Sequence, residues 1–255
     1  MGQLATYPSL KDRVVFVTGG GSGIGEAVVE AFCEQGSKVT FVDIARKTSE
    51  ALVERIVERG YARPRFIECD LRNIPALQKA IGSSGEADGP TRVLVNNAAN
   101  DDRHHFSEVT VEYWDDRMSV NLRHQFFAAQ AVYPQMKAAG GGSIINFGSI
   151  SWMNNEGGYA GYTTAKAAIG GLTRTLARDF GPDKIRVNTV VPGWVMTQRQ
   201  IDLWLNAEGE RQIQELQCLK EKVYPVDIAR MVLFLASDDA RMCSAQNFIV
   251  DGGWA

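Results

Sequence analysis

The sequence predicts an α/β fold, in which a doubly wound parallel sheet of seven strands carries helices on both faces. Short runs of β-branched and other apolar residues alternate with segments of helical length along the whole chain. These runs are almost continuously apolar, which is typical of parallel strands that are buried on both faces. Neither a linker nor a shift in composition divides the alternation, so we predict a single domain over residues 1–255.

The predicted strands are seven short runs, at residues 14–18, 39–42, 66–68, 93–96, 143–147, 186–190 and 248–250. The predicted helices lie between them, at residues 23–35, 46–59, 75–81, 111–138, 159–180 and 226–237. This alternation implies right-handed crossovers between neighbouring parallel strands. Residues 195–224 interrupt it, and a long insert of this kind is more often a lid or a binding region than a structureless loop.

The composition excludes several classes of protein. With 27 basic and 30 acidic side chains in 255 residues, the net charge is -3, which gives no electrostatic case for nucleic-acid binding. No apolar run approaches the roughly 20 residues that cross a bilayer. The four cysteines form no CxxC pair, so we expect a reduced, cytoplasmic protein. Residues 1–6 fit an N-myristoylation pattern, but no basic cluster follows them, and we expect no membrane attachment.

A glycine-rich turn joins the first predicted strand to the first predicted helix. It reads Thr-Gly-Gly-Gly-Ser-Gly-Ile-Gly at residues 18–25. Glycines at such a turn let a pyrophosphate approach the backbone, and the positive end of the helix faces that anion. The spacing does not match the strict G-x-G-x-x-G pattern, and a tight turn without a ligand is the alternative. The position between strand and helix favours a dinucleotide site.

Acidic residues follow the next two predicted strands. Asp43 closes the second strand, where a carboxylate accepts hydrogen bonds from the adenosine ribose hydroxyls and repels a 2′-phosphate. This favours NAD over NADP, although Arg46 lies close enough in sequence to pair with that phosphate. Asp70 follows the third strand and has two equally ordinary uses, as a second nucleotide contact or as a helix cap for residues 73–81.

Tyr162 and Lys166 lie four residues apart and are therefore neighbours on one helix face. A free tyrosine has a pKa of about 10 and is almost entirely protonated at neutral pH. An ammonium ~4 Å away, at an effective dielectric of ~20, stabilises an anion by about 4 kcal/mol. One well-placed lysine therefore suffices to make a tyrosine a usable base, although the same pair is also common as a structural feature of helices.

Three further polar residues accompany this pair. Ser149 lies just past the fifth strand, and open α/β sheets bind ligands at the carboxyl ends of their strands. Its alternative role is that of a cap or turn hydroxyl. Asn121 lies within a predicted helix, where an amide is more often simply exposed. Asn97 ends the fourth strand and is also compatible with an ordinary turn.

The ordered set of motifs resembles the short-chain dehydrogenase/reductase family. It consists of the glycine turn, Asn-Asn-Ala at 96–98, Asn121, Ser149, Tyr-x-x-x-Lys at 162–166, and Pro-Gly at 192–193 with Thr197. The resemblance runs from residue 13 to about residue 253. It implies a Rossmann-type fold, with a nucleotide-binding half over about 13–97 and a catalytic and substrate half over about 98–253. A possible substrate lid covers about 195–224.

The resemblance also implies a role for each matching residue. Tyr162 becomes the acid/base, Lys166 lowers its pKa and holds the nicotinamide ribose, Ser149 positions the reacting oxygen, and Asn121 anchors a water relay. The implied cofactor contacts are Gly19, Ser22, Gly23, Ile24, Gly25, Asp43, Asp70, Leu71, Asn97, Ala98, Ala99, Tyr162, Lys166, Pro192, Gly193, Val195 and Thr197. Ala99 is a departure, since the family often has glycine there.

A narrower resemblance is to bacterial NAD-dependent aldose 1-dehydrogenases of the D-xylose group, with D-galactose and L-arabinose dehydrogenases nearby. Its motifs are residues 7–11, 100–104, 121–124, 145–152, 217–220, 235–243 and 250–254. Such enzymes oxidise the anomeric hydroxyl of a cyclic sugar to a lactone. A sugar site needs aromatic walls and a few fixed polar groups. The candidate substrate contacts are Asn100, Ser149, Trp152, Asn154, Tyr162 and Trp194, with Asp102 and Glu156 as further hydroxyl contacts.

No metal site is predicted, because His104, His105 and His124 have no acidic or cysteine partner at ligand spacing. The resemblance implies a homo-oligomer, either a dimer or a tetramer. Two alternatives to a sugar dehydrogenase remain open. One is a reductase of the same fold that acts on another alcohol or ketone, such as a 3-oxoacyl substrate. The other is a non-catalytic nucleotide-binding protein.

Overall fold

The computed structural model describes residues 5–255 and contains the predicted seven-stranded sheet, in which every strand pair is parallel. The strands are β1 (Val14–Thr18), β2 (Lys38–Asp43), β3 (Arg65–Glu68), β4 (Val93–Asn96), β5 (Gly142–Phe147), β6 (Ile185–Pro192) and β7 (Asn247–Val250). Their order is β3-β2-β1-β4-β5-β6-β7, so the winding reverses between β1 and β4. The doubly wound fold is therefore confirmed, and ligands of such sheets bind at this reversal.

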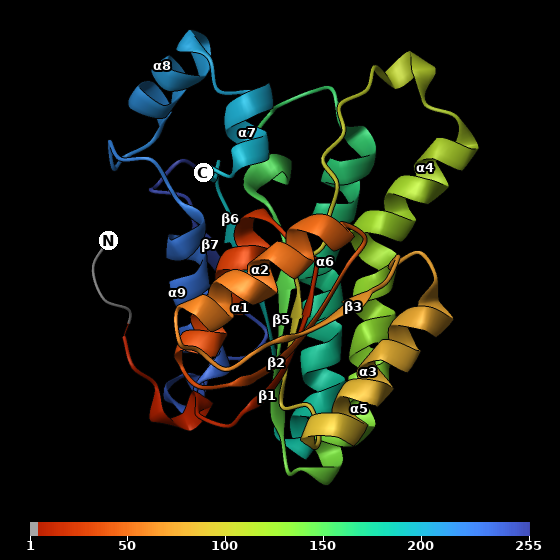
Figure 1. Cartoon of the computed structure of the whole chain (residues 1–255). Helices are drawn as coiled ribbons and strands as arrows, with labels where there is room; N and C mark the ends of the chain where they lie inside the picture. The colour runs from red at the N-terminus through yellow and green to blue at the C-terminus, as the bar shows by residue number, and fades with distance from the viewer. Residues whose placement is uncertain (1–4) are drawn as a thin grey trace.

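The longer helices cover both faces of the sheet (Figure 1). With the shorter ones included, the α-helices are α1 (Gly23–Glu34), α2 (Arg46–Glu58), α3 (Ile74–Asp88), α4 (Val111–Met118), α5 (His124–Ala138), α6 (Ala160–Phe180), α7 (Gln198–Leu203), α8 (Ala207–Leu216) and α9 (Pro225–Ala236). α3 continues seven residues beyond the predicted end at residue 81, through a glycine- and serine-rich stretch that carries little helical signal.

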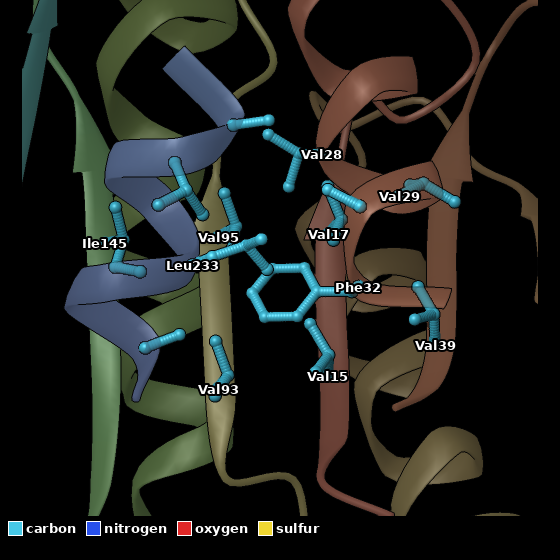
Figure 2. Packing of buried hydrophobic residues seen from close by; sticks show 14 of the residues in the cluster. Val15, Val17, Val28, Val29, Phe32, Val39, Val93, Val95, Ile145 and Leu233 are labelled. Atoms are coloured by element: carbon cyan, nitrogen blue, oxygen red, sulfur yellow. The ribbon is translucent and has the colours of Figure 1, made fainter. Parts of the chain in front are cut away.

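Two apolar layers hold the helices on the sheet. In one layer, Val28 and Phe32 of α1 and Leu233 of α9 pack on strand residues that include Val15 and Val95 (Figure 2). The other layer joins α3, α5 and α6 to the opposite face. Neighbouring residues of a strand point to opposite faces, so a strand buried on both sides is apolar along most of its length, as the sequence predicted.

The predicted helix over residues 111–138 is in fact two helices separated by a π-helical turn, Ser119–Arg123. Such turns interrupt helices frequently at functional sites. Asn121 lies within the turn and is fully buried, so the alternative in which it is merely exposed is wrong. Hydrophobic periodicity continues through one extra residue, which is why the sequence showed no break there.

The predicted insert at 195–224 contains α7 and α8, which lie together at one end of the molecule (Figure 1). A parallel bridge between Val195 and Val223 joins the two ends of the insert, so the segment leaves and re-enters the fold at one place. None of the helices within residues 5–255 has both the length and the apolar character needed to span a bilayer. The acylation-like pattern begins in residues 1–4, which lie outside the described part of the chain.

Candidate active site

A cleft of about 1040 Å³ opens at the carboxyl ends of the strands, at the point where the winding reverses. Most of the residues predicted from the sequence line it. They are Gly19, Ser22, Ile24, Asp43, Asp70, Leu71, Asn97, Ala98, Ala99, Asn100, Ser149, Asn154, Tyr162, Lys166, Pro192, Gly193, Trp194, Val195 and Thr197. Glu156 lines it as well, whereas five other predicted residues do not, namely Gly23, Gly25, Asp102, Asn121 and Trp152.

The glycine turn forms a closely packed cradle at one end of the cleft. Gly19 has a φ of +67°, and a Cβ on it would come within 2.7 Å of the Ala98 Cα. A Cβ on Gly25 would lie 1.8 Å from the carbonyl oxygen of Gly19. Asn97 fixes the turn from β4, since its Nδ2 donates to that same carbonyl at 2.8 Å. Gly25 therefore acts by allowing close approach, and it need not touch a ligand itself.

The first turn of α1 completes this cradle. Its N-cap, Ser22, forms no side-chain hydrogen bond to the helix and lines the cleft together with Ile24. Uncapped backbone N–H groups at the positive end of a helix are suited to bind a pyrophosphate. The turn and the helix end thus fit the dinucleotide that the sequence predicts.

Asp43 lies where a ribose-binding carboxylate is expected. Its Oδ2 accepts from the Gly21 amide and its Oδ1 from the Ala45 amide, both at 2.9 Å, so the carboxylate is held in place at the edge of the cleft. Arg46, which the sequence offered as a partner for the 2′-phosphate of NADP, is paired with Glu68 and with Glu50. The arrangement fits NAD, because a fixed negative charge stands at the site of a 2′-phosphate.

Asp70 lines the cleft but does not cap a helix. Its carboxylate forms a two-pronged ion pair with Arg72, and that contact holds the pKa of Asp70 below its ordinary value. The cap of α3 is Asn73, whose side chain accepts from the Ala76 amide at 3.1 Å. The helix-cap alternative for Asp70 is therefore wrong.

Ser149 and Tyr162 meet inside the cleft. Ser149 caps the short turn Ile150–Trp152, accepting from the Ser151 amide at 3.2 Å, and lines the cleft together with the phenol of Tyr162. Ser149 is thus both the predicted cap and a neighbour of the phenol. Burial raises the pKa of Tyr162 to about 12, and the Ser149 hydrogen bond opposes that shift.

Lys166 lies one helical turn from Tyr162, but its amine sits over the phenol ring. Nζ is 5.5 Å from the ring centroid and donates to the carbonyl oxygen of Phe147 at 2.8 Å. Only 2% of the residue is exposed, and this burial lowers the pKa of the amine to about 7. Burial of the phenol has the largest influence on the pKa of Tyr162 within the protein itself, and the expectation that Lys166 lowers this pKa stays a prediction.

Asn121 acts behind the cleft wall. Its Nδ2 donates to the Arg117 carbonyl at 3.0 Å, and its Oδ1 accepts from the Asn100 amide at 2.8 Å. One turn further on, the fully buried His124 contacts the Ala98 carbonyl through Nε2 at 3.1 Å. Burial and the Lys166 charge lower the pKa of His124 to about 3, so its ring stays neutral and donates to that carbonyl. Within residues 5–255, no cluster of three or more potential ligands is arranged to hold a metal ion.

The substrate end of the cleft is aromatic, although not as predicted. Trp194 lines it, with Nε1 donating to Gln200 at 3.1 Å. Trp152 is 42% exposed and lies outside the lining, so it does not form the predicted wall. The other walls are Tyr159, Trp204 and Trp254. A signal for Tyr159 was available, since it precedes Tyr162 by three residues and so shares its helix face.

The loop after β4 is tied to α7 by ion pairs. Arg199 of α7 bonds Asp101 at 3.2 Å and Asp102 at 3.0 Å. Asp102 also pairs with Arg117 at 3.2 Å and does not line the cleft, which corrects its prediction as a hydroxyl contact. Glu156 does line the cleft, and its carboxylate accepts from the Tyr159 hydroxyl at 2.6 Å. The substrate end is therefore closed by both the predicted insert and this loop.

Comparisons with known proteins agree with this site. A family model described as enoyl-(acyl carrier protein) reductase matches residues 19–255. The probable galactose dehydrogenase GalD of Rhizobium meliloti strain 1021 is 51% identical over 247 residues, 97% of this chain and 96% of that protein. The D-xylose 1-dehydrogenase of Caulobacter vibrioides is 50% identical over 250 residues, 98% of each chain.

A solved structure of a 7α-hydroxysteroid dehydrogenase, complexed with NADH and 7-oxo glycochenodeoxycholic acid, superposes with a TM-score of 0.89. It is 27% identical and covers 97% of both chains. The nucleotide cradle, the Ser149–Tyr162 contact and these matches agree, and the chain belongs to the short-chain dehydrogenase/reductase family.

Proposed function

We propose that this protein is an NAD-dependent aldose 1-dehydrogenase, which oxidises the anomeric hydroxyl of a D-xylose, D-galactose or L-arabinose type sugar to the lactone. The observation that carries the proposal is that Ser149, Tyr162 and Lys166 line one cleft together with a dinucleotide cradle. The substrate class is supported by the two relatives of about 50% identity, which are named for galactose and D-xylose.

NAD would lie with its pyrophosphate at the glycine turn and its adenosine ribose at Asp43. When bound, NAD supplies a nicotinamide ring that accepts a hydride. The fixed Asp43 carboxylate and the engaged Arg46 support NAD over NADP. In the family to which the chain belongs, the lysine of the Tyr-x-x-x-Lys motif holds the nicotinamide ribose. The buried position of Lys166 at the cleft wall is compatible with that role.

The reaction breaks the O–H and C–H bonds at C1 of the sugar and forms a C1–O double bond. Tyr162, as phenolate, takes the hydroxyl proton, while the electron pair of the C–H bond leaves with the hydride. Ser149 hydrogen-bonds the same oxygen and favours ionisation of Tyr162. Lys166, whose pKa of about 7 lets it exchange protons near neutrality, would return Tyr162 to its starting state. Asn121 holds the loop at Asn100 and, we propose, anchors the water relay behind Lys166.

The lining of the substrate end favours a sugar over an acyl chain. Polar side chains such as Arg103, Glu156 and Gln200 stand among the aromatic walls. A hydroxylated ring has apolar C–H faces and polar edges, so it can use both kinds of group, whereas an acyl chain would leave the polar groups without partners. A reductase of the 3-oxoacyl type is the alternative that assays must separate.

The test is a panel of aldoses assayed by NADH absorbance with NAD and NADP in parallel, together with 3-oxoacyl and simple ketone substrates. We expect lactone formation with at least one aldose and with NAD preferred. Ketone reduction without any sugar oxidation would overturn the proposal. Binding of NADH without turnover of any substrate would favour a non-catalytic nucleotide-binding protein.

Tyr162→Phe should abolish turnover while leaving the Kd for NADH nearly unchanged, because it removes only the phenolic oxygen. Tyr133→Phe makes the same change on α5, where the hydroxyl bonds Asp183 away from the cleft. This control should keep full activity. Loss of NADH binding in Tyr162→Phe would show that the phenol does not act as the base.

We further propose that the protein is cytoplasmic and forms a dimer or tetramer, with residues 195–224 as a substrate lid on one domain. The four cysteines are free, which suits a reducing compartment. Exposed apolar side chains on α4, α5 and β7, namely Val111, Phe126 and Ile249, offer surface for association. Light scattering after size exclusion measures the state, and a monomer at micromolar concentration would contradict the oligomer.

A further inference from the structure

Arg103 lies in the loop between β4 and α4 and reaches the substrate end of the cleft. Its guanidinium Cζ is 3.8 Å from the centroid of the Tyr159 ring and 5.1 Å from that of Trp204. The Tyr159 ring in turn stacks on Tyr162, with centroids 5.8 Å apart and planes at 25°. The guanidinium is therefore placed one aromatic ring away from the phenol that we assign as the base.

The Arg103 guanidinium has no carboxylate partner among the described residues. Throughout residues 5–255, no acidic oxygen lies within ion-pair distance of Arg103, although both preceding residues are acidic. Asp101 and Asp102 are instead paired with Arg199, and Asp102 also with Arg117. The N–H donors of Arg103 that are not in contact with Tyr159 are thus available to a ligand in the cleft.

The surroundings of Arg103 fix its position. Three residues upstream, the Asn100 amide is held by Asn121, and Asp101 anchors the loop to α7. The aromatic platform is fixed as well, because the Tyr159 hydroxyl donates to Glu156 at 2.6 Å. Pre-organised polar groups lose little conformational entropy when they bind a ligand, which is what a specificity site requires.

We propose that Arg103 is a specificity-determining residue, which donates hydrogen bonds to sugar hydroxyl oxygens remote from C1 while Ser149 and Tyr162 hold the oxygen on C1. This assignment rests on the proposed function. A guanidinium presents two parallel N–H groups, which match a pair of neighbouring hydroxyl oxygens on a ring. Glu156, beside the same platform, is placed to accept from a hydroxyl that Arg103 does not satisfy.

The charge of this end of the cleft favours a neutral sugar over one that bears a carboxylate. Apart from Lys166 at the catalytic centre, the charged side chains that line this end are the guanidiniums of Arg103 and Arg117 and the carboxylates of Asp101 and Glu156. Equal numbers of opposite charges leave no net positive field to attract an anion. The positive charge of Arg103 also favours the Tyr162 phenolate, whereas the negative charge of Asp101 opposes it.

The experiment compares wild type with Arg103→Gln on the preferred aldose, on its monodeoxy analogues at the hydroxyls other than C1, and on the matching uronic acid. We expect kcat/KM for the parent sugar to fall roughly 10- to 100-fold, mainly through KM, as for a lost hydrogen bond to a charged donor. For the analogue that lacks the hydroxyl bound by Arg103, wild type and variant should differ by less than about threefold.

Further variants separate this role from a structural one. Arg103→Lys keeps the charge without the planar fork and should recover only part of the activity. The pH at which kcat/KM rises should move upward in Arg103→Gln more than in Arg103→Lys, because only the former removes the charge near Tyr162. Arg178→Gln, an exposed position of α6 outside the cleft, is the matched control and should leave all values unchanged.

Three results would overturn the assignment. They are an unchanged kcat/KM in Arg103→Gln, an equal loss for the parent and every deoxy analogue, and a loss confined to the uronic acid, which would make Arg103 a carboxylate site. Each presupposes a wild type that oxidises an aldose. If wild type oxidises no aldose, the proposed function itself fails and this assignment fails with it.

Discussion

Replacing Asp43 by Asn should shift the cofactor preference toward NADP. The change removes one negative charge at the ribose end of the cleft while keeping an oxygen that can still accept from one of the two backbone amides that Asp43 now binds. Losing the other hydrogen bond should cost about 1–3 kcal/mol of stability. The variant should therefore fold, with a lowered melting temperature.

The magnitude follows from Coulomb's law. A carboxylate about 5 Å from a 2′-phosphate charge, at an effective dielectric of ~20, repels it by about 3 kcal/mol. Physiological salt roughly halves this value over such a distance, which leaves about a 20-fold effect on NADP. The lost ribose hydrogen bond should weaken NAD by about tenfold. The ratio of kcat/KM for NAD to that for NADP should therefore fall by about 200-fold.

The assay measures kcat/KM for both cofactors at a saturating aldose concentration. Asp239→Asn makes the same charge change at an exposed residue outside the cleft and should leave the ratio unchanged. Glu68→Gln, which removes one of the two ion pairs of Arg46 and leaves that with Glu50, should improve NADP use without weakening NAD. An unchanged ratio in Asp43→Asn would remove Asp43 from the ribose and refute the reasoning.

Three further outcomes are expected. Gly25→Ala should abolish NADH binding and lower the melting temperature, because its Cβ would overlap a carbonyl oxygen of the turn. The control Gly82→Ala, with open space around it, should stabilise α3 by about 0.5–1 kcal/mol. Equal changes of melting temperature in the two variants would contradict the close packing at Gly25. Lys166→Met should stabilise the fold most below pH 7. Burial lowers the pKa of Lys166 from 10.5 to about 7, so between these values the unfolded chain binds more protons and wild-type stability rises with pH. The advantage of the variant should therefore fade by on the order of 5 kcal/mol toward pH 10.5 in urea unfolding, and a pH-independent difference would contradict this shift. Trp194→Ala should raise KM for the sugar roughly tenfold while Trp152→Ala leaves it unchanged, and the reverse result in steady-state kinetics would restore Trp152 as the wall.

The sequence predicted the sheet well because burial on both faces produces short apolar runs that can be identified locally. Most strand residues that face a helix layer are apolar, so the runs at Val14–Thr18 and Val93–Asn96 could be identified with their ends correct. The glycine turn could also be identified from the sequence, since no residue with a side chain fits at Gly25. Local patterns therefore sufficed for the sheet and for the nucleotide end of the cleft.

The remaining features depend on contacts between distant residues. The π-helical turn at Asn121 is stabilised by a hydrogen bond from the Asn100 amide, 21 positions away in sequence. Hydrophobic periodicity along one helix does not indicate such a bond. Tyr159 lines the cleft and Trp152 does not, because Trp152 ends a short turn after Ser149 that leaves its side chain exposed. The pKa of Tyr162 depends on how deeply the phenol is buried, which spacing along one helix does not determine.

Transfer of isotope from the sugar tests the central claim most directly. Incubating the protein with NAD and an aldose deuterated only at C1 should yield NADH that carries one deuterium and a lactone that carries none, as seen by mass spectrometry. The same incubation with Tyr162→Phe should yield neither product. Unlabelled NADH from the deuterated sugar would show that oxidation occurs at another carbon, and it would contradict the account.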